Sequence, residues 1–293
     1  MVMAAVGGVG ATIGLMIGAW FGWARFKEWR RSQRAKRHRQ AVEQLAHPEV
    51  AVRIAGVYAL EQLTSETSSE SSAVLEELSA FARGRTKPFT DIIDADIQAA
   101  LRAISRVIRD CDADASRHAS LHGCHMVGAQ LAETWFRGVD FELVIAGSLD
   151  PLVRAASFRK SDLRGAGFRA ANLVWVNFWR ANMRGADCRN AILISAMLIR
   201  ADLRGADLRG ADLRGARLTN AKLRDARLQG ADLSTATGLT RDQIARAFVD
   251  DKTRLPDGLV HVHMTVWDVL RAVVRGHSRS QRDRIEIGGR GDA

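Results

Sequence analysis

Residues 201–215 read Ala-Asp-Leu-Arg-Gly three times in succession, and this stretch decides the fold. A period of five residues matches neither the alternation of a strand nor the helical turn of about 3.6 residues. The chain must therefore turn a corner in every unit, so that each leucine returns to the same environment. The sequence predicts a coiled solenoid whose every fifth residue points inward.

The same period extends from Leu121 to Leu233 in two registers. The first has at its central positions Leu121, Met126, Leu131, Phe136, Phe141 and a weak Ala146. The second has Val153, Phe158, Leu163, Phe168, Leu173, Phe178, Met183, Cys188, Leu193, Leu198, Leu203, Leu208, Leu213, Leu218, Leu223, Leu228 and Leu233. Because Ala146 and Val153 are seven positions apart, we expect two additional residues near Leu149–Pro151 to form a bulge.

These units resemble the pentapeptide-repeat family over residues 119–235. The resemblance implies an all-β solenoid, a right-handed quadrilateral β-helix with four five-residue faces in each coil. It also implies that the central residue and the small residue two positions before it point inward. Cys188 would then be a core residue rather than a reactive one, because an apolar site raises the pKa of a thiol and so disfavours the reactive thiolate.

The N-terminal segment carries no charged side chain from Met1 to Ala24, which is longer than the roughly 20 residues that span a bilayer. Trp20 and Trp23 end this run, and a basic segment over residues 25–40 follows it. The pattern predicts a single-pass transmembrane helix over 1–24 of a bacterial cytoplasmic membrane. The charge asymmetry places the N-terminus outside and the repeat domain in the cytosol.

Four glycines recur at every fourth position of this run, namely Gly10, Gly14, Gly18 and Gly22. Such spacing lets a second helix approach closely, so the sequence favours self-association and a homo-oligomer. The alternative is that glycine is simply common in membrane helices.

Three amphipathic segments lie within residues 41–112, and their apolar residues recur at helical spacing. The runs that begin at His47 and Asp96 resemble the second helix of HEAT or armadillo-like repeats. We expect a small all-α domain here that either caps the solenoid or contacts a partner, with an ordinary helical linker as the alternative. Residues 238–276 are expected to form capping helices, and 277–293 a disordered tail.

The outward position after each central residue forms four vertical ladders, since residues twenty apart stack on one face. Two ladders are basic and could bind a polyanion or an acidic protein; the alternative is an ordinary solvated face, because nearby aspartates partly offset the charge. Their residues are Arg164, Arg184, Arg204 and Arg224, with Arg169, Arg189 and Arg209 beside them. The other two lose their arginines and become apolar. With neighbouring positions they give a patch of Val174, Trp175, Trp179, Ile192, Ile194, Met197 and Ile199. An exposed patch of this kind is a partner interface, unless the segment around Val266–Val273 covers it.

Catalytic signatures are missing from the sequence: it has no phosphate loop, nucleophile elbow or HExxH motif. The Cys and His residues between Cys111 and His125 fit no zinc spacing. The sequence therefore predicts a chain without enzymatic activity, cofactor or metal.

The formal net charge of +10 is compatible with nucleic acid, anionic lipid or acidic protein as a partner. We expect a membrane-anchored scaffold that presents its β-helix to an unknown cytosolic protein. Nucleic-acid or polyanion binding through the arginine ladders is the alternative. DNA mimicry directed at topoisomerases, which occurs in the family, is less favoured because residues 153–233 hold 16 Lys and Arg against 7 Asp and Glu.

Overall fold

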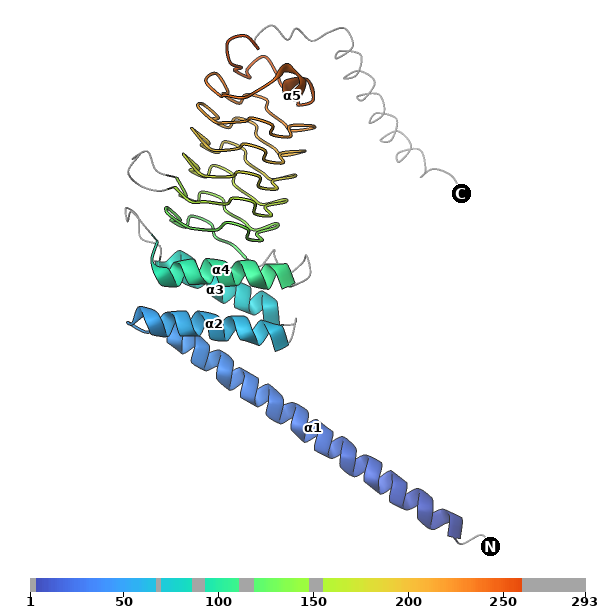
Figure 1. Cartoon of the computed structure of the whole chain (residues 1–293). Coiled ribbons are helices and arrows are strands. Elements are labelled where there is room, and N and C mark those ends of the chain that lie inside the picture. The colour runs from blue at the N-terminus through green and yellow to red at the C-terminus, as the bar shows by residue number, and fades with distance from the viewer. Residues whose placement is uncertain (1–3, 67–69, 86–92, 111–118, 148–154, 260–293) are drawn as a thin grey trace, which may run out of the picture.

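The structure is a computed structural model that describes residues 4–66, 70–85, 93–110, 119–147 and 155–259. Figure 1 shows a long N-terminal helix, then a layer of helices, then a stack of coils. The named elements of the described residues are the helices α1 (Ala4–Leu45), α2 (Val50–Glu66), α3 (Ser71–Arg85), α4 (Ala95–Asp110) and α5 (Arg241–Ala245).

The predicted transmembrane helix is wrong. Among the described residues, no helix has the length and apolar character needed to cross a membrane. The physical reason is that the uncharged run is not an element of its own: α1 continues for 42 residues, through the basic segment, to Leu45. The predicted single-pass membrane localisation, with the N-terminus outside, depended on this helix and is wrong as well.

Helices α2, α3 and α4 form the layer below the first coil, and the end of α1 packs against α2 (Figure 1). Their core contains Leu60, Leu78 and Leu101, which are fully buried. Gly56 lets α1 and α2 approach closely, because a Cβ there would lie 2.8 Å from the Ala41 carbonyl oxygen. The limits of this predicted all-α domain, residues 41–112, stay a prediction.

Each repeat unit has the same local structure. The central residue and the small residue two positions before it are buried, as Leu203 and Ala201 illustrate. The corner is a β-turn in which the Ala206 N–H donates to the Leu203 carbonyl over 3.0 Å. Gly205, the second corner residue, has φ +67°, which is the conformation that a type II turn needs at this position.

Neighbouring coils pair through isolated parallel bridges, one on each face, such as Asp202 with Lys222. The fold class was therefore predicted wrongly in two respects: it included a transmembrane helix, and the described repeats have bridges rather than extended strands. The solenoid itself is present. Cys188 is fully buried within it, and burial raises the pKa of its thiol.

The bridges also correct the predicted two-residue bulge. In the first coils residues 20 apart interact, as Ser120 does with Asp140, but Thr134 interacts with Ser161, 27 positions later. Seven residues (27 − 20), rather than two, are therefore inserted. Phe158 takes the face assigned to Val153, which itself lies, with Leu149–Pro151, outside the described residues.

Phenylalanines fill the lower part of the solenoid. Phe141 and Phe168 stack with ring centroids 4.8 Å apart, and Phe158 and Phe178 stack at 5.5 Å. Farther up the stack leucine takes over the central positions, and the side chains remain fully buried. Close-packed walls of this kind make the solenoid a rigid platform for the outward side chains.

Glutamine side chains close both ends of the stack. At the N-terminal end, Gln98 of α4 donates to the Gln130 carbonyl over 3.0 Å and accepts from the Gln130 N–H over 2.8 Å. At the other end, Gln243 of α5 donates to the carbonyls of Leu218 and Ala221. These bonds satisfy backbone groups that would otherwise form an open edge.

Candidate functional site

Three positions of each unit reach the surface: the outward position before the central residue, and the first and second corner residues after it. A carboxylate or amide at the outward position accepts from the N–H of the first corner residue, as Asn177 does from Trp179 over 3.0 Å. Glycine suits the second corner position because φ is positive there. Residues other than glycine also adopt a positive φ at this position, among them Leu143, Lys160 and Asn190.

Several departures gather in the coils over residues 172–200. Ile192 and Met197 stand at outward positions, where the coil below has Asn172 and Asn177. Ile192 is 39% exposed, and Met197 is half-buried. The half-buried Trp179, Ile194 and Ile199 occupy first corner positions beside them. We call Trp175, Trp179, Ile192, Ile194, Met197 and Ile199 the apolar patch.

Val174 does not belong to this patch, although the sequence placed it there. Its side chain is buried, with 1% exposed. The chain of the previous coil lies directly against it: a Cβ on Gly147 would be 2.3 Å from the Val174 backbone nitrogen and oxygen. Val174 therefore cannot present its side chain to a partner.

Trp175 is the most unusual residue of the apolar patch. It stands at a second corner position with φ +60° and is 55% exposed. A bulky residue is a true outlier in this backbone region, and the left-handed conformation costs about 1–2 kcal/mol for a residue with a Cβ. Ten other residues with a Cβ have a similar φ at corners along the solenoid, so Trp175 is set apart by its bulk and exposure together with this conformation.

Two guanidinium groups lie over the indole ring of Trp179. The Arg159 group lies 4.4 Å from the centroid of the indole ring, and the Arg180 group lies 4.5 Å from it. Cations over an indole face stabilise its orientation. The ring therefore has a defined position at the edge of the apolar patch.

Most arginines of the predicted polyanion ladders are held by an aspartate two positions earlier. Arg204 is 2.6 Å from Asp202, and Arg209 is 2.7 Å from Asp207. Arg164 and Arg189 are held in the same way. Arg224 and Arg169 have looser contacts with Asp225 and Glu142, at 3.4 and 3.9 Å. Of the seven, only Arg184 has no acidic partner in the part of the chain that the structure describes.

The pairs of an arginine with the aspartate two positions earlier, here called clamps, predict that the stability of the fold depends on pH. The side-chain hydrogen bond from Arg189 lowers the pKa of Asp187, and that from Arg214 lowers the pKa of Asp212. A carboxyl with a lowered folded pKa stabilises the fold above its unfolded value of about 3.9, and this stabilisation is lost as pH falls through the folded value.

We therefore expect the melting temperature to fall as the pH is lowered below about 4. The variant with Asp187→Asn and Asp212→Asn keeps the turn acceptors but removes both titrating groups, so its curve should be flatter. Calorimetry from neutral to acidic pH measures both. Parallel curves for the two proteins would contradict the assigned role of the clamps.

A group that sequence reasoning missed consists of His122, Asp140 and Glu142. One potential ligand atom from each lies within 4.8 Å of the others. Asp140 already accepts from the Ser120 hydroxyl and the Glu142 N–H, and the Arg169 guanidinium lies 3.9 Å from Glu142. Because these carboxylates already accept hydrogen bonds from protein groups or contact an arginine, we assign them no metal. The expectation of a chain without metal or cofactor stays a prediction.

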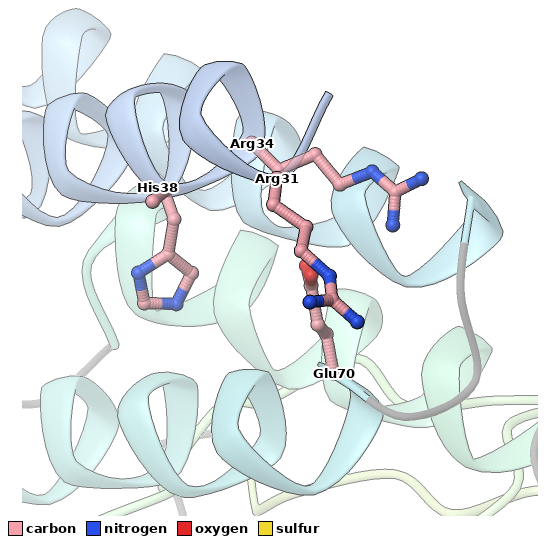
Figure 2. Close-up of a pocket in the computed structure, with 5 residues that line it drawn as sticks. Arg31, Arg34, His38 and Glu70 are labelled. Carbon is pink, nitrogen blue, oxygen red and sulfur yellow. The ribbon is translucent and has the colours of Figure 1, made fainter. Parts of the chain in front are cut away.

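An open depression of about 300 Å³ lies between α1 and the segment before α3. Figure 2 shows that Arg31, Arg34 and His38 of α1 line it on one side and Glu70 on the other. His38 Nε2 is 3.1 Å from Glu77 Oε2, and burial raises the pKa of Glu77. Groups of opposite charge face each other here, so the depression favours neither an anion nor a cation.

Two further predictions remain untested. The side-chain surroundings of Gly10, Gly14 and Gly18 lie outside the described residues, and a Cβ on Gly22 would meet open space. Helix association and a homo-oligomer thus stay predictions. Residues 266–273, the internal candidate to cover the patch, also lie outside the described residues.

Comparison with known proteins addresses the repeat. Residues 171–210 and 201–237 match the family model for pentapeptide repeats, in eight copies. No curated protein matches the chain. Among solved structures, a pentapeptide repeat protein from the thylakoid lumen of Arabidopsis thaliana is 30% identical; the match covers 36% of this chain and 69% of that one, with a TM-score of 0.33.

Two further structures are similar to the chain. A pentapeptide repeat protein from the cyanobacterium Cyanothece 51142 is 25% identical, with 46% of this chain and 90% of that one covered and a TM-score of 0.29. QnrB1, a plasmid-mediated fluoroquinolone resistance protein, is 18% identical, with 50% and 84% covered and a TM-score of 0.22. The five-residue unit, its buried columns and the matching family model agree, and the chain belongs to the pentapeptide-repeat family.

Proposed function

We propose that this chain is a non-catalytic binding scaffold whose β-helix presents the apolar patch to a partner protein. The observation that carries the proposal is Trp175, a large exposed side chain at a position whose backbone favours glycine. Tryptophan is enriched among residues that dominate binding energy at interfaces. A strained and exposed tryptophan next to apolar side chains that are at least partly exposed is what such an interface needs.

The neighbouring outward positions support the same proposal. An amide at position 192 or 197 could accept from the N–H of the first corner residue, as Asn172 does from Val174 over 3.2 Å. Ile192 and Met197 cannot make this bond. Positions that break a local structural preference without a structural gain are expected at functional sites.

A variant that restores the repeat preferences tests the proposal. It carries Trp175→Gly, Ile192→Asn and Met197→Asn, each toward the residue type found elsewhere at that position. Because glycine relieves the positive φ and the amides add turn acceptors, we expect a melting temperature equal to or above that of the wild type. Binding should nevertheless fall, since the apolar patch is removed.

Photo-crosslinking in the cell measures the binding. A benzophenone amino acid at position 199 should give a discrete crosslinked protein in the wild-type background, and the band should disappear in the restored variant. The same probe at Gln229 should give none. A control with Ala170→Gly and Lys222→Asn makes the same kinds of change away from the patch and should keep the band. An unchanged band in the restored variant would contradict the proposal.

A further inference from the structure

Four arginines border the apolar patch without forming an ion pair with a described carboxylate, although Glu133 lies near enough to Arg159 for a longer-range attraction. They are Arg159, Arg180, Arg200 and Arg217, here called the basic rim; all four are exposed. Among the described residues, none of them has an acidic side chain within 4.0 Å, the distance that defines an ion pair. Elsewhere on the solenoid Arg164, Arg189, Arg204, Arg209 and Arg214 are each paired with an aspartate two positions earlier.

The difference follows from the sequence of the units. Arg204 is a first corner residue, and the outward residue of its unit is Asp202, whose carboxylate reaches back to it. Arg180 and Arg200 stand at second corner positions, and the outward residues of their units are Asn177 and Met197. No carboxylate is supplied there. Arginine charge outside an ion pair is therefore concentrated where the surface is also apolar.

From this juxtaposition we infer, on the basis of the function proposed above, that the partner is a protein segment that combines apolar side chains with Asp or Glu carboxylates. The apolar patch takes the apolar side chains, and the basic rim takes the carboxylates. Complementary charge at the border of an apolar centre gives specificity and speeds association. An arginine that is not held in an ion pair forms such a contact without first breaking one.

Other partners that carry negative charge fit the surface less well. A nucleic acid would use the arginines, and could stack bases on the tryptophans, but it offers nothing to Ile192, Ile194 and Ile199. A lipid surface requires side chains that protrude, whereas Trp179, Ile194, Met197 and Ile199 are half-buried. A second copy of this chain would bring arginines against arginines.

Selection from a displayed library of random dodecapeptides against the full-length protein tests the inference. We expect the enriched peptides to contain both Asp or Glu and large apolar residues. Replacing Arg180, Arg200 and Arg217 with glutamine should weaken the binding of these peptides at least tenfold at low salt. Added salt should also weaken the binding of these peptides to the wild type, because it screens the charges of the basic rim. Glutamine keeps a polar side chain at all three exposed positions and the same positive φ at Arg180 and Arg200, so stability should change little.

Arg184→Gln provides the matched control, because Arg184 is exposed and also lacks an acidic partner among the described residues, yet lies away from the patch. It should change binding less than twofold. Peptides that are apolar but not acidic, and that ignore the basic rim, would overturn the inference and leave the proposed function intact. Enrichment that is equal on the restored variant, or no enrichment at all, would overturn both.

Phosphatidylglycerol vesicles and a single-stranded 30-nucleotide DNA complete the test. Weak binding of either, independent of the apolar patch, agrees with the inference. Binding tighter than that of the selected peptides, with dependence on both the basic rim and the patch, would identify a lipid surface or a nucleic acid as the partner and overturn it.

Discussion

Replacing Leu208 with aspartate is expected to lower the free energy of unfolding by at least about 4 kcal/mol. Leu208 is 1% exposed, and the residues above and below it in the same column, Cys188 and Leu228, are fully buried. The substitution removes an apolar side chain and adds a carboxylate that finds no partner inside the solenoid. Urea unfolding followed by circular dichroism measures the loss.

Two controls separate burial of the charge from other effects. Leu208→Met nearly conserves the volume and should cost less than about 1.5 kcal/mol. Thr219→Asp adds the same carboxylate at an exposed corner and should have little effect. Burial raises the pKa of an aspartate, so Leu208→Asp should regain stability as the pH falls, because the protonated form is favoured in the folded state. An unchanged unfolding transition would contradict the inward orientation of this column.

The solenoid could be predicted because a five-residue period leaves few alternatives. Once each leucine must return to the same environment, the inward columns follow from the residue numbers alone. The size of the insertion could not be predicted in this way. Val153 lies five positions before Phe158 and has a suitable side chain, so the sequence assigned this face of the coil to it. Only the pairing of Gln130 with Ser157 shows that Phe158 takes this face.

The exposure of part of the apolar patch was predicted, and its role as an interface stays a prediction. Exposure of Trp175 and Ile192 agrees with the outward positions read from the repeat. The prediction that Val174 is exposed was wrong, because its burial depends on the neighbouring coil, where Gly147 lies against it. The basic rim was missed for a different reason: it can be recognised only within each unit, by whether an aspartate stands two positions before the arginine. An arginine two positions after an aspartate is neutralised, and the sequence already distinguishes such units from those at the patch.

The prediction of a transmembrane helix was wrong because the helix was assumed to begin and end with the uncharged run. The apolar run ends at Ala24, but α1 does not end there; it continues to Leu45, where it packs on α2. The end of a helix depends on its contacts as well as its composition. In this chain Ala41 and Leu45, near the end of α1 and well beyond the first charged residue, are buried in the core of the helical layer.

The second large effect is expected in the helical layer. Arg53→Met should lower the free energy of unfolding by about 3–5 kcal/mol, because it leaves a buried carboxylate without its main partner. Arg53 Nε lies 2.5 Å from Asp96 Oδ2, and the two side chains are only 4% and 0% exposed. Arg85, at 3.4 Å from the same oxygen, is more exposed and cannot replace it fully.

A double-mutant cycle distinguishes the ion pair from simple packing. Arg53→Met with Asp96→Leu removes both charges, so the double variant should be more stable than Arg53→Met alone. A double variant that is less stable than the single one would show that Arg53 acts through its own packing and its bonds to the carbonyls of His47 and Pro48.

The consequence should reach the β-helix as well. Asp96 stands in the first turn of α4, two positions before Gln98, which pairs with the backbone of the first coil, and Ser105 of the same helix accepts from the Trp135 N–H. Displacing α4 would expose the backbone edge of that coil, and open edges of this kind associate. We therefore expect Arg53→Met to aggregate in a concentration-dependent way, as light scattering would show. The Arg53→Met, Asp96→Leu variant should remain dispersed, because α4 keeps its place when no charge is left buried.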